Sequence, residues 1–175
     1  VNIGNIESTR KKAKFPGKYD ILGIVIISNN FLKYTIRLFR GRLIKMSYIF
    51  KENLVSSNKY SIKCPYTMKP RYIVCHNTAN DASAENEVKY MISNNNWVSY
   101  HVAVDDKYAI QAIPFNRNAW HTGDGANGNG NRYGIGVEIC YSKSGGARYT
   151  QAEENAVYVM ARLLYKYDLG IDALK

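Results

Sequence analysis

Four runs of apolar or alternating residues predict β-strands in the second half of the chain. They cover residues 71–76, 98–104, 108–113 and 135–141. The first run is apolar until it reaches His76, which indicates a buried strand that delivers a histidine to the edge of a sheet. In the last run, isoleucine and valine alternate with other residues, and Glu138 falls on the face opposite its aliphatic neighbours.

Two segments have the spacing of amphipathic helices. The first follows a capping residue, Asp81 or Ser83, and places Val88, Met91 and Ile92 on one face. The second is predicted to open at a capping box, residues 150–153. Its buried stripe consists of Ala156, Val157, Met160, Leu163 and Leu164. Residues 46–70 are expected to form a loop. The order of elements predicts a single α/β domain, a mixed central β-sheet flanked by helices.

Positive charge is concentrated at the start of the chain. Residues 1–45 hold ten lysines and arginines against two acidic residues, whereas residues 46–175 hold fourteen against twelve. We therefore expect a basic N-terminal extension, residues 1–45, that is not part of the native domain if translation starts at Met46. Solvated charge explains such an arm most simply. Binding to nucleic acid is the competing interpretation, but no motif supports a specific nucleic-acid partner.

The sequence has no signature of export or of a membrane span. Its longest apolar run, residues 21–27, is too short to cross a bilayer as a helix and lacks a cleavage site after it. The three cysteines, Cys64, Cys75 and Cys140, form no even framework, which favours reduced thiols. We expect a protein made in the cytoplasm without a signal peptide and without a membrane-spanning segment.

Three histidines and one carboxylate are the candidates for chemistry. His76 ends a strand, His101 lies within one, and His121 lies in a glycine-rich loop, residues 117–131, that we expect to form a mobile lip of a groove. A zinc hydrolase needs about three protein ligands, an open position for water and a carboxylate that takes the proton. His76 and Glu138 supply one ligand and that carboxylate.

Several motifs, in order along residues 46–175, resemble one enzyme family. They are Val74-Cys75-His76-Asn77-Thr78, residues 84–88, residues 98–106, Ile113-Pro114, Arg117-Asn118-Ala119-Trp120-His121, residues 123–125 and residues 137–142, with residues 63–68 similar to its N-terminal edge. The resemblance is to the zinc-dependent N-acetylmuramoyl-L-alanine amidases of phage endolysins. It implies the fold of the type 2 amidases and peptidoglycan recognition proteins.

The resemblance also implies roles for individual residues. His76 matches the first zinc ligand, and Glu138 matches the catalytic glutamate that activates water. Asn77, His101, Trp120 and His121 match positions that bind substrate. The implied reaction is hydrolysis of the amide bond between N-acetylmuramic acid and L-alanine, with bacterial peptidoglycan as partner and Zn²⁺ as cofactor, during cell-wall lysis.

The sequence departs from the family at its end. The family takes its second and third zinc ligands from a segment after the last helix, and no histidine or cysteine of this chain matches them. We therefore expect residues 46–175 to be an amidase domain lacking its C-terminal edge, with one of three zinc ligands present. The alternatives are a non-catalytic peptidoglycan-binding module and a replacement site made of His76, His101 and His121. The sequence does not determine the oligomeric state or the target bacterium.

Overall fold

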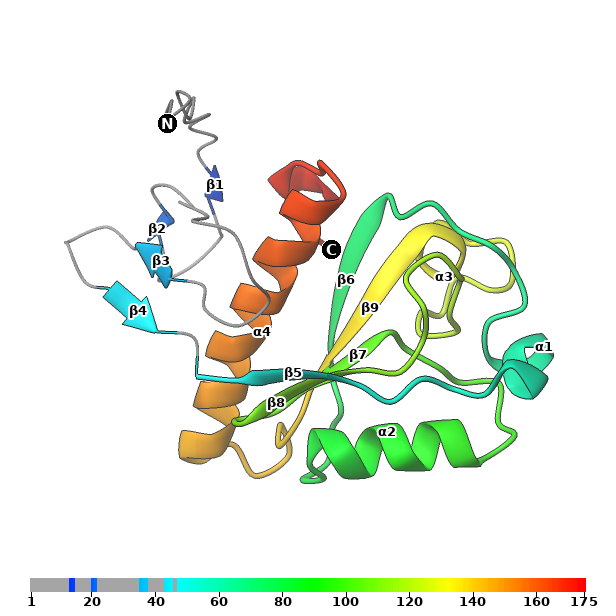
Figure 1. Ribbon diagram of the computed structural model, residues 1–175, viewed down its shortest axis with the longest axis horizontal. Helices are drawn as coiled ribbons and strands as arrows, with labels where there is room; N and C mark the ends of the chain where they lie inside the picture. Colours follow the sequence, from blue (N-terminus) through cyan, green and yellow to red (C-terminus); the bar gives the residue numbers. More distant parts are fainter. Residues whose placement is uncertain (1–12, 15–19, 22–34, 38–42, 46) are drawn as a thin grey trace, which may run out of the picture. The chain divides into compact units, whose positions relative to one another are not determined.

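The computed structural model describes residues 47–175 and, in the first part of the chain, residues 13–14, 20–21, 35–37 and 43–45 (Figure 1). The chain divides into two units, Val1–Met46 and Ser47–Lys175. In the first unit, β1 (Ala13–Lys14) pairs antiparallel with β2 (Asp20–Ile21), and β3 (Thr35–Arg37) pairs antiparallel with β4 (Leu43–Lys45). The apolar run at residues 21–27 lies almost entirely outside the described residues, and the proposed status of residues 1–45 stays a prediction.

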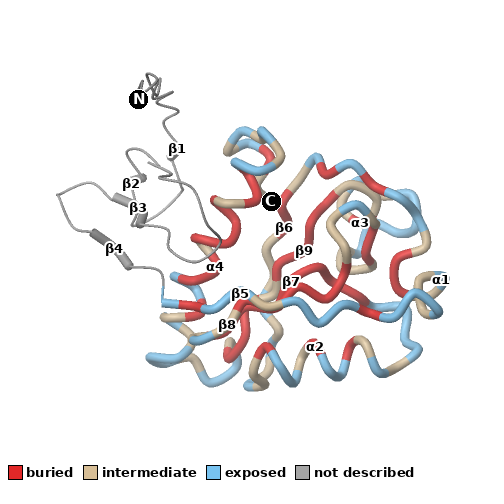
Figure 2. The backbone as a smooth tube through the Cα atoms, in the orientation of Figure 1, coloured by how far each residue is buried: buried red, intermediate tan, exposed pale blue. Residues whose placement is uncertain are grey.

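The second unit is built on a five-stranded mixed sheet. Its strands are β5 (Ile49–Glu52), β6 (Tyr72–Asn77), β7 (Val102–Val104), β8 (Tyr108–Gln111) and β9 (Gly134–Ile139). They lie in the order β5-β8-β7-β9-β6, in which only β7 and β8 run antiparallel. Buried residues are concentrated in the central strands (Figure 2). The predicted α/β class with a mixed sheet is confirmed.

Helix α2 (Ala84–Ser93) covers one face of the sheet over β7 and β8. Ser83, one of the two candidate caps predicted from the sequence, caps this helix. Its hydroxyl accepts a hydrogen bond from the Asn86 amide at 3.3 Å. Val88 and Met91 are buried, in a cluster that includes Ala103 and Ile110 of the sheet. At the other end of the helix, the Lys59 ammonium donates to the Ile92 carbonyl, where a cation is favoured by the helix dipole.

Helix α4 (Gly146–Lys166) packs on the same sheet through β6, β7, β8 and β9. Its predicted stripe is buried at Ala156, Met160, Leu163 and Leu164, whereas Val157 is half-buried. The helix begins at Gly146, one turn before the predicted capping box, and its N-cap, Gly145, makes no side-chain hydrogen bond. The predicted start was therefore wrong: Thr150 and Glu153 lie inside the helix.

Two other predictions about local structure were wrong. Residues 46–70 are not a continuous loop: they contain β5, the 3₁₀ helix η1 (Ser57–Lys59) and helix α1 (Tyr60–Lys63). The alternating run at 98–104 is a strand only from Val102, and Val98 is 63% exposed. Pairing with neighbouring strands, which local alternation does not encode, set both limits.

Smaller elements complete this unit. The short helix α3 (Asn129–Tyr133) leads directly into β9, and the 3₁₀ helix η2 (Ile171–Ala173) follows α4. After η2, the Lys175 amide donates to the Ile73 carbonyl, which places this segment along β6. Cys64, Cys75 and Cys140 are free thiols, as predicted. No helix in the described part of the chain is long and apolar enough to span a membrane.

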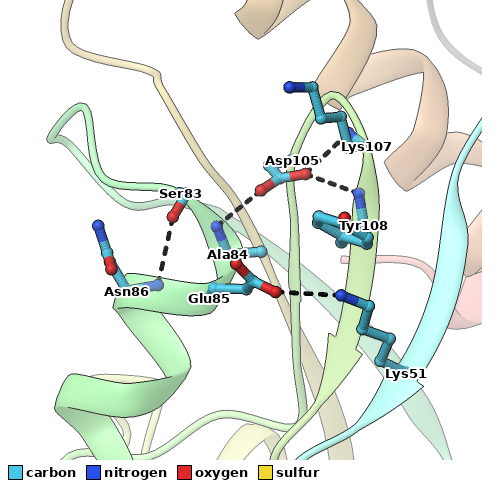
Figure 3. Close-up of polar contacts among 8 residues, drawn as sticks. All are labelled: Lys51, Ser83, Ala84, Glu85, Asn86, Asp105, Lys107 and Tyr108. Atoms are coloured by element: carbon cyan, nitrogen blue, oxygen red, sulfur yellow. Dashed lines mark hydrogen bonds and ion pairs between the residues drawn. The ribbon is translucent and has the colours of Figure 1, made fainter.

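The Asp105 carboxylate connects α2 to the turn between β7 and β8 (Figure 3). One oxygen accepts from the Ala84 amide at 2.9 Å, and the other accepts from the amides of Lys107 and Tyr108 at 2.8 and 2.7 Å. The Asp105 carbonyl accepts from the side chain of Asn155 in α4 at 2.8 Å. Asp105 is 2% exposed. This single residue therefore joins both helices to the central strands.

Replacing Asp105 by asparagine is expected to destabilise the protein by about 2–4 kcal/mol. The amide keeps the shape of the side chain but turns an N–H group toward one of the three amide donors, which then lies buried without an acceptor. Denaturant unfolding measures the change. Asp106→Asn, at the half-buried neighbour, is the control and should change stability by less than about 0.5 kcal/mol. Equal effects of the two substitutions would contradict the role of Asp105.

Candidate functional site

The site lies on the part of the sheet face that α2 leaves uncovered. The strand register aligns Ile110 with Ala103, Ala103 with Glu138, and Glu138 with His76. Residues in register point to the same face of a sheet. Ile110 and Ala103 lie in the core cluster with α2. His76 and Glu138 continue the same row on β6 and β9, where both side chains are only half-buried.

His121 fits onto this uncovered face because β9 has no side chain there. A Cβ atom on Gly136 would lie 2.7 Å from Cγ of His121, so the imidazole occupies the space above the glycine. The His121 ring approaches the His76 ring edge-on, with centroids 5.3 Å apart. The alternation of glycine with isoleucine and valine in β9 thus has a function that its hydrophobic pattern did not reveal.

Hydrogen bonds define the tautomers of this histidine pair. Nε2 of His121 lies 3.2 Å from the Gly134 carbonyl, which can only accept, so this nitrogen carries the proton. Nδ1 of His121 is then an acceptor and receives a hydrogen bond from Nε2 of His76 at 3.1 Å. Burial lowers the pKa of His76, and burial together with His76 lowers the pKa of His121 to about 4. Both imidazoles are neutral at pH 7.

His101 is the third histidine of this group. It is fully buried and donates from Nε2 to the Arg117 carbonyl at 2.9 Å, while Nδ1 accepts from the Gly136 amide at 3.0 Å. Burial and the neighbouring His121 lower its pKa to about 3. With both nitrogens engaged, His101 has no free position for a metal ion. The replacement zinc site made of three histidines was therefore wrong.

The glycine-rich loop that carries His121 is organised around two side chains. The buried Asn131 carboxamide oxygen accepts from the amides of His121 and Thr122 at 2.8 and 2.9 Å. The Asp124 carboxylate accepts from the Thr122 hydroxyl and from the Gly130 amide at 2.7 Å. Sequence reasoning described this loop as a mobile lip and missed both residues. Their hydrogen bonds instead hold His121 over the sheet.

Glu138 is the carboxyl group of this cluster, and its pKa is altered. Burial, with a smaller contribution from Glu87, raises its pKa to about 7. Glu87 is in turn held by the Asn80 side chain, which donates to its carboxylate. A carboxyl group with a pKa near 7 exchanges protons readily at neutral pH, as a general acid or base must. The sequence placed Glu138 on the correct face, whereas its altered pKa depends on tertiary burial.

Tyr100 is a third polar residue whose place in the site the sequence did not reveal. Its buried hydroxyl has no hydrogen-bond partner among the described residues. Burial, with smaller contributions from the neighbouring Glu87 and Glu138, raises its pKa, so the hydroxyl stays protonated. An unpartnered buried donor in this region is available to water or to a bound molecule.

The two remaining predicted residues lie at different distances from this cluster. Trp120 directly precedes His121, and its indole nitrogen donates to the Ile62 carbonyl at 2.9 Å. Asn77 aligns with Ile139, one position beyond the His76–Glu138 pair, and therefore belongs to the opposite face. Its side chain accepts from the Tyr149 hydroxyl of α4 at 3.1 Å. The structure brings His76, His121 and Glu138 together and leaves Asn77 at the rim.

Comparison with known proteins identifies the family. Residues 66–174 match the family model described as N-acetylmuramoyl-L-alanine amidase. The chain belongs to the N-acetylmuramoyl-L-alanine amidase family. It is 61% identical over 124 residues to the amidase CwlA of Bacillus subtilis (strain 168), and this match covers 71% of the chain and 46% of CwlA. It is 58% identical over 130 residues to the amidase XlyB of the same strain, covering 74% and 41% of the two chains.

Solved structures agree with this assignment. The structure of PlyL is 62% identical, with a TM-score of 0.71 over 72% of this chain and 79% of PlyL. The catalytic domain of PlyG is also 62% identical, with a TM-score of 0.70 over 72% of this chain and 76% of PlyG. The predicted type 2 amidase fold is confirmed. The chain spans about half the length of the curated relatives it matches.

Members of this amidase family are generally zinc-dependent. His76 and His121 present two nitrogens 3.1 Å apart, but a hydrogen bond between them occupies both. Within residues 47–175, no three histidine, cysteine or acidic side chains are grouped to hold a metal ion. Zinc sites in proteins use three or four such ligands. The described residues alone therefore do not fit a complete zinc site.

Gly136→Ala is expected to displace His121 from the site. The new Cβ would lie 2.7 Å from Cγ of the ring, and relief of this clash should cost about 1–3 kcal/mol of stability. NMR of the imidazole nitrogens should show loss of the His76–His121 hydrogen bond. Gly123→Ala, where a Cβ meets nothing within 4 Å, is the matched control. Unchanged imidazole signals in the Gly136 variant would contradict this packing.

Glu138→Gln is expected to reduce the loss of folding stability that occurs as pH rises. The folded-state pKa of about 7 exceeds the ordinary value of 4.5, so the folded protein holds a proton that the unfolded chain has already lost. Glu138 therefore lowers stability as pH rises from about 4.5 to 7. The free energy of unfolding of the glutamine variant, relative to that of the parent, should increase by on the order of 1 kcal/mol between pH 5 and pH 8.

Denaturant unfolding of both proteins in the presence of a chelator measures this difference. The buried histidines lower the stability as pH falls below their ordinary pKa. This effect is common to both proteins and cancels in the comparison. A difference in stability that stays constant from pH 5 to pH 8 would show that Glu138 has an ordinary pKa.

Proposed function

We propose that this domain hydrolyses the amide bond between N-acetylmuramic acid and L-alanine in bacterial peptidoglycan. The observation that carries the proposal is Glu138, a partly desolvated carboxyl group with a pKa raised to about 7, aligned with His76 on an open sheet face. Membership of the amidase family supports the choice of substrate. The protein would act on the cell wall in the manner of an endolysin, with peptidoglycan as its partner.

The chemistry assigned to Glu138 is transfer of one proton. As a carboxylate it removes a proton from water while the water oxygen forms a bond to the lactyl carbonyl carbon. The resulting carboxylic acid then returns this proton to the alanine nitrogen as the C–N bond breaks. The products are a lactyl carboxylic acid and a stem peptide with a free amine. A pKa near 7 allows the same side chain to perform both transfers.

The other predicted residues are proposed to bind or to position. Trp120 and His121 would contact the substrate on the open face. Asn77, at the end of β6, would contact it only where the substrate extends past the rim, because its side chain belongs to the opposite face. His101 would act through its hydrogen bond to the Gly136 amide, because its own side chain is fully buried. His76 is proposed as one ligand of a Zn²⁺ ion. Because Nε2 of His76 donates to His121, binding would use Nδ1 or would require this hydrogen bond to break, and it would need further ligands from outside the described residues.

A non-catalytic peptidoglycan-binding module is the second candidate. The specific observation in its favour is the absence of a three-ligand cluster among residues 47–175. Such a module would keep the aromatic and histidine residues of the open face and would hold the wall without cleaving it.

Release of free amino groups from purified cell walls tests the proposed reaction. Both the chain and a form continued along its reading frame past Lys175 should be assayed with added zinc. In whichever form is active, Glu138→Gln is expected to reduce turnover by about 10²–10⁴-fold while wall binding persists. Glu154→Gln, at an exposed glutamate of α4, is the control and should retain activity.

Two results would overturn parts of the proposal. Wall binding without amine release by either form would establish the non-catalytic module. Full activity of Glu138→Gln would remove the proton-transfer role from this residue. Zinc content of the active form provides a separate check, because His76→Ala should lower it if His76 is a ligand.

A further inference from the structure

Three aromatic residues and one arginine form an exposed group beside the histidine pair. Tyr66, Trp97, Trp120 and Arg132 are named here the aromatic patch. Trp97 is 66% exposed and Tyr66 is 42% exposed. The Trp97 and Trp120 ring centroids lie 6.3 Å apart with planes inclined at 43°, and Tyr66 meets Trp120 edge-on at 6.1 Å. Large aromatic side chains left this open usually mark a binding surface.

The patch rests on a firmly bonded base. The indole of Trp120 is fixed to the Ile62 carbonyl at 2.9 Å, and the Tyr66 amide donates to the Asn118 side chain at 2.8 Å. The segment that carries Trp97 is held from beneath by the buried Lys63 ammonium, which donates to the carbonyls of Asn96 and Val98 at 2.6 and 3.0 Å. Trp97 is therefore exposed on a backbone segment that joins α2 to β7 and is held by Lys63 of α1.

Arg132 adds hydrogen-bond donors at the edge of the patch. Its guanidinium carbon lies 4.0 Å from the centroid of the Tyr66 ring. Its Nε is buried and has no acceptor among the described residues. A guanidinium group has N–H groups that can donate to hydroxyl or carbonyl oxygens of a ligand, and it can do so while its carbon lies over a tyrosine ring.

The aromatic patch continues the candidate site along the chain. Trp120 is followed immediately by His121, which contacts His76. Consecutive Cα atoms are about 3.8 Å apart, so the backbone that carries Trp120 adjoins the backbone that carries His121. Trp97 and Tyr66 are the next rings beyond Trp120.

We infer that the aromatic patch binds a pyranose ring of the N-acetylated glycan strand, with Trp97 as the principal stacking surface. This inference rests on the proposed function. One face of a pyranose carries C–H groups with slight positive charge, which pack on the negative face of an indole, while the ring hydroxyls accept hydrogen bonds from a guanidinium. Four side chains are too few for a stable protein interface, which buries about 800 Å² on each partner.

The tryptophans of the chain provide a probe of this surface. The sequence contains two tryptophans, Trp97 and Trp120, and both belong to the patch. Tryptophan emission, excited at a wavelength that tyrosine does not absorb, therefore reports on the patch alone. The probe ligand is N,N′,N″-triacetylchitotriose, a trisaccharide of N-acetylglucosamine that contains no muramoyl–alanine amide. Saturable change of emission on titration is expected for the parent protein.

Substitution of Trp97 separates binding by the patch from binding elsewhere. Trp97→Ala should weaken trisaccharide binding by about tenfold, read from the remaining emission of Trp120, and Trp97→Phe should restore most of it. Tyr165→Ala is the matched control, because Tyr165 is 67% exposed on α4 and should leave binding unchanged. In an active form, Trp97→Ala should raise KM for cell walls several-fold and leave kcat within about twofold.

The outcomes distinguish this inference from the proposed function. Emission that does not respond to the trisaccharide, or equal affinities of the parent and Trp97→Ala, would overturn the glycan surface even if walls are cleaved. A response to a sugar-free peptide that begins with L-alanine, without a response to the trisaccharide, would assign the patch to the stem peptide instead. Trisaccharide binding that depends on Trp97, without amine release from walls, would support the glycan surface and overturn the hydrolytic function.

Discussion

The buried carboxylate of Asp105 is the constraint on which the arrangement of this domain depends. It accepts three backbone hydrogen bonds, from the first turn of α2 and from the turn that joins β7 to β8. Its carbonyl receives the Asn155 side chain of α4. Because α2 is anchored over β7 and β8, it leaves the adjoining face of β9 and β6 free. The open face that holds the candidate site is thus a consequence of where the helix is fixed.

On this open face, desolvation of the ionisable side chains determines their pKa values. His76, His121 and His101 have pKa values lowered by desolvation, and Glu138 has one raised by desolvation. At neutral pH the imidazoles are uncharged, so their nitrogens form a directed chain of hydrogen bonds from His76 to His121 to the Gly134 carbonyl. A neutral, ordered cluster beside a carboxyl group that titrates near pH 7 is suited to proton transfer with an uncharged amide.

Close approach of backbone and side chain is the second requirement of the site. Gly136 has no side chain, which admits the His121 ring, and its amide fixes the buried His101. Asn131 and Asp124 hold the loop that presents His121. Beyond this loop, Trp120 connects the histidines to the exposed Trp97 and Tyr66. One segment, residues 117–131, thereby links the proposed reaction centre to the proposed glycan surface.

The sequence by itself determined the class of fold, four strands of the main sheet, the position of α2, and the choice of His76 and Glu138 as candidates for chemistry. These features depend on local periodicity and on residue types at strand ends, which are written in neighbouring positions. It could not give the edge strand β5, the true start of α4, or the short extent of β7, because pairing with distant strands decides them.

Only the tertiary structure decided the state of the site. It showed that His101 is buried with both nitrogens engaged, that Asn77 belongs to the opposite face, and that Gly136 makes room for His121. It also raised the pKa of Glu138 to about 7, a value that no sequence pattern contains. The physical reason is the same throughout: desolvation and contact arise between segments that are far apart in the chain and meet only when the sheet has formed.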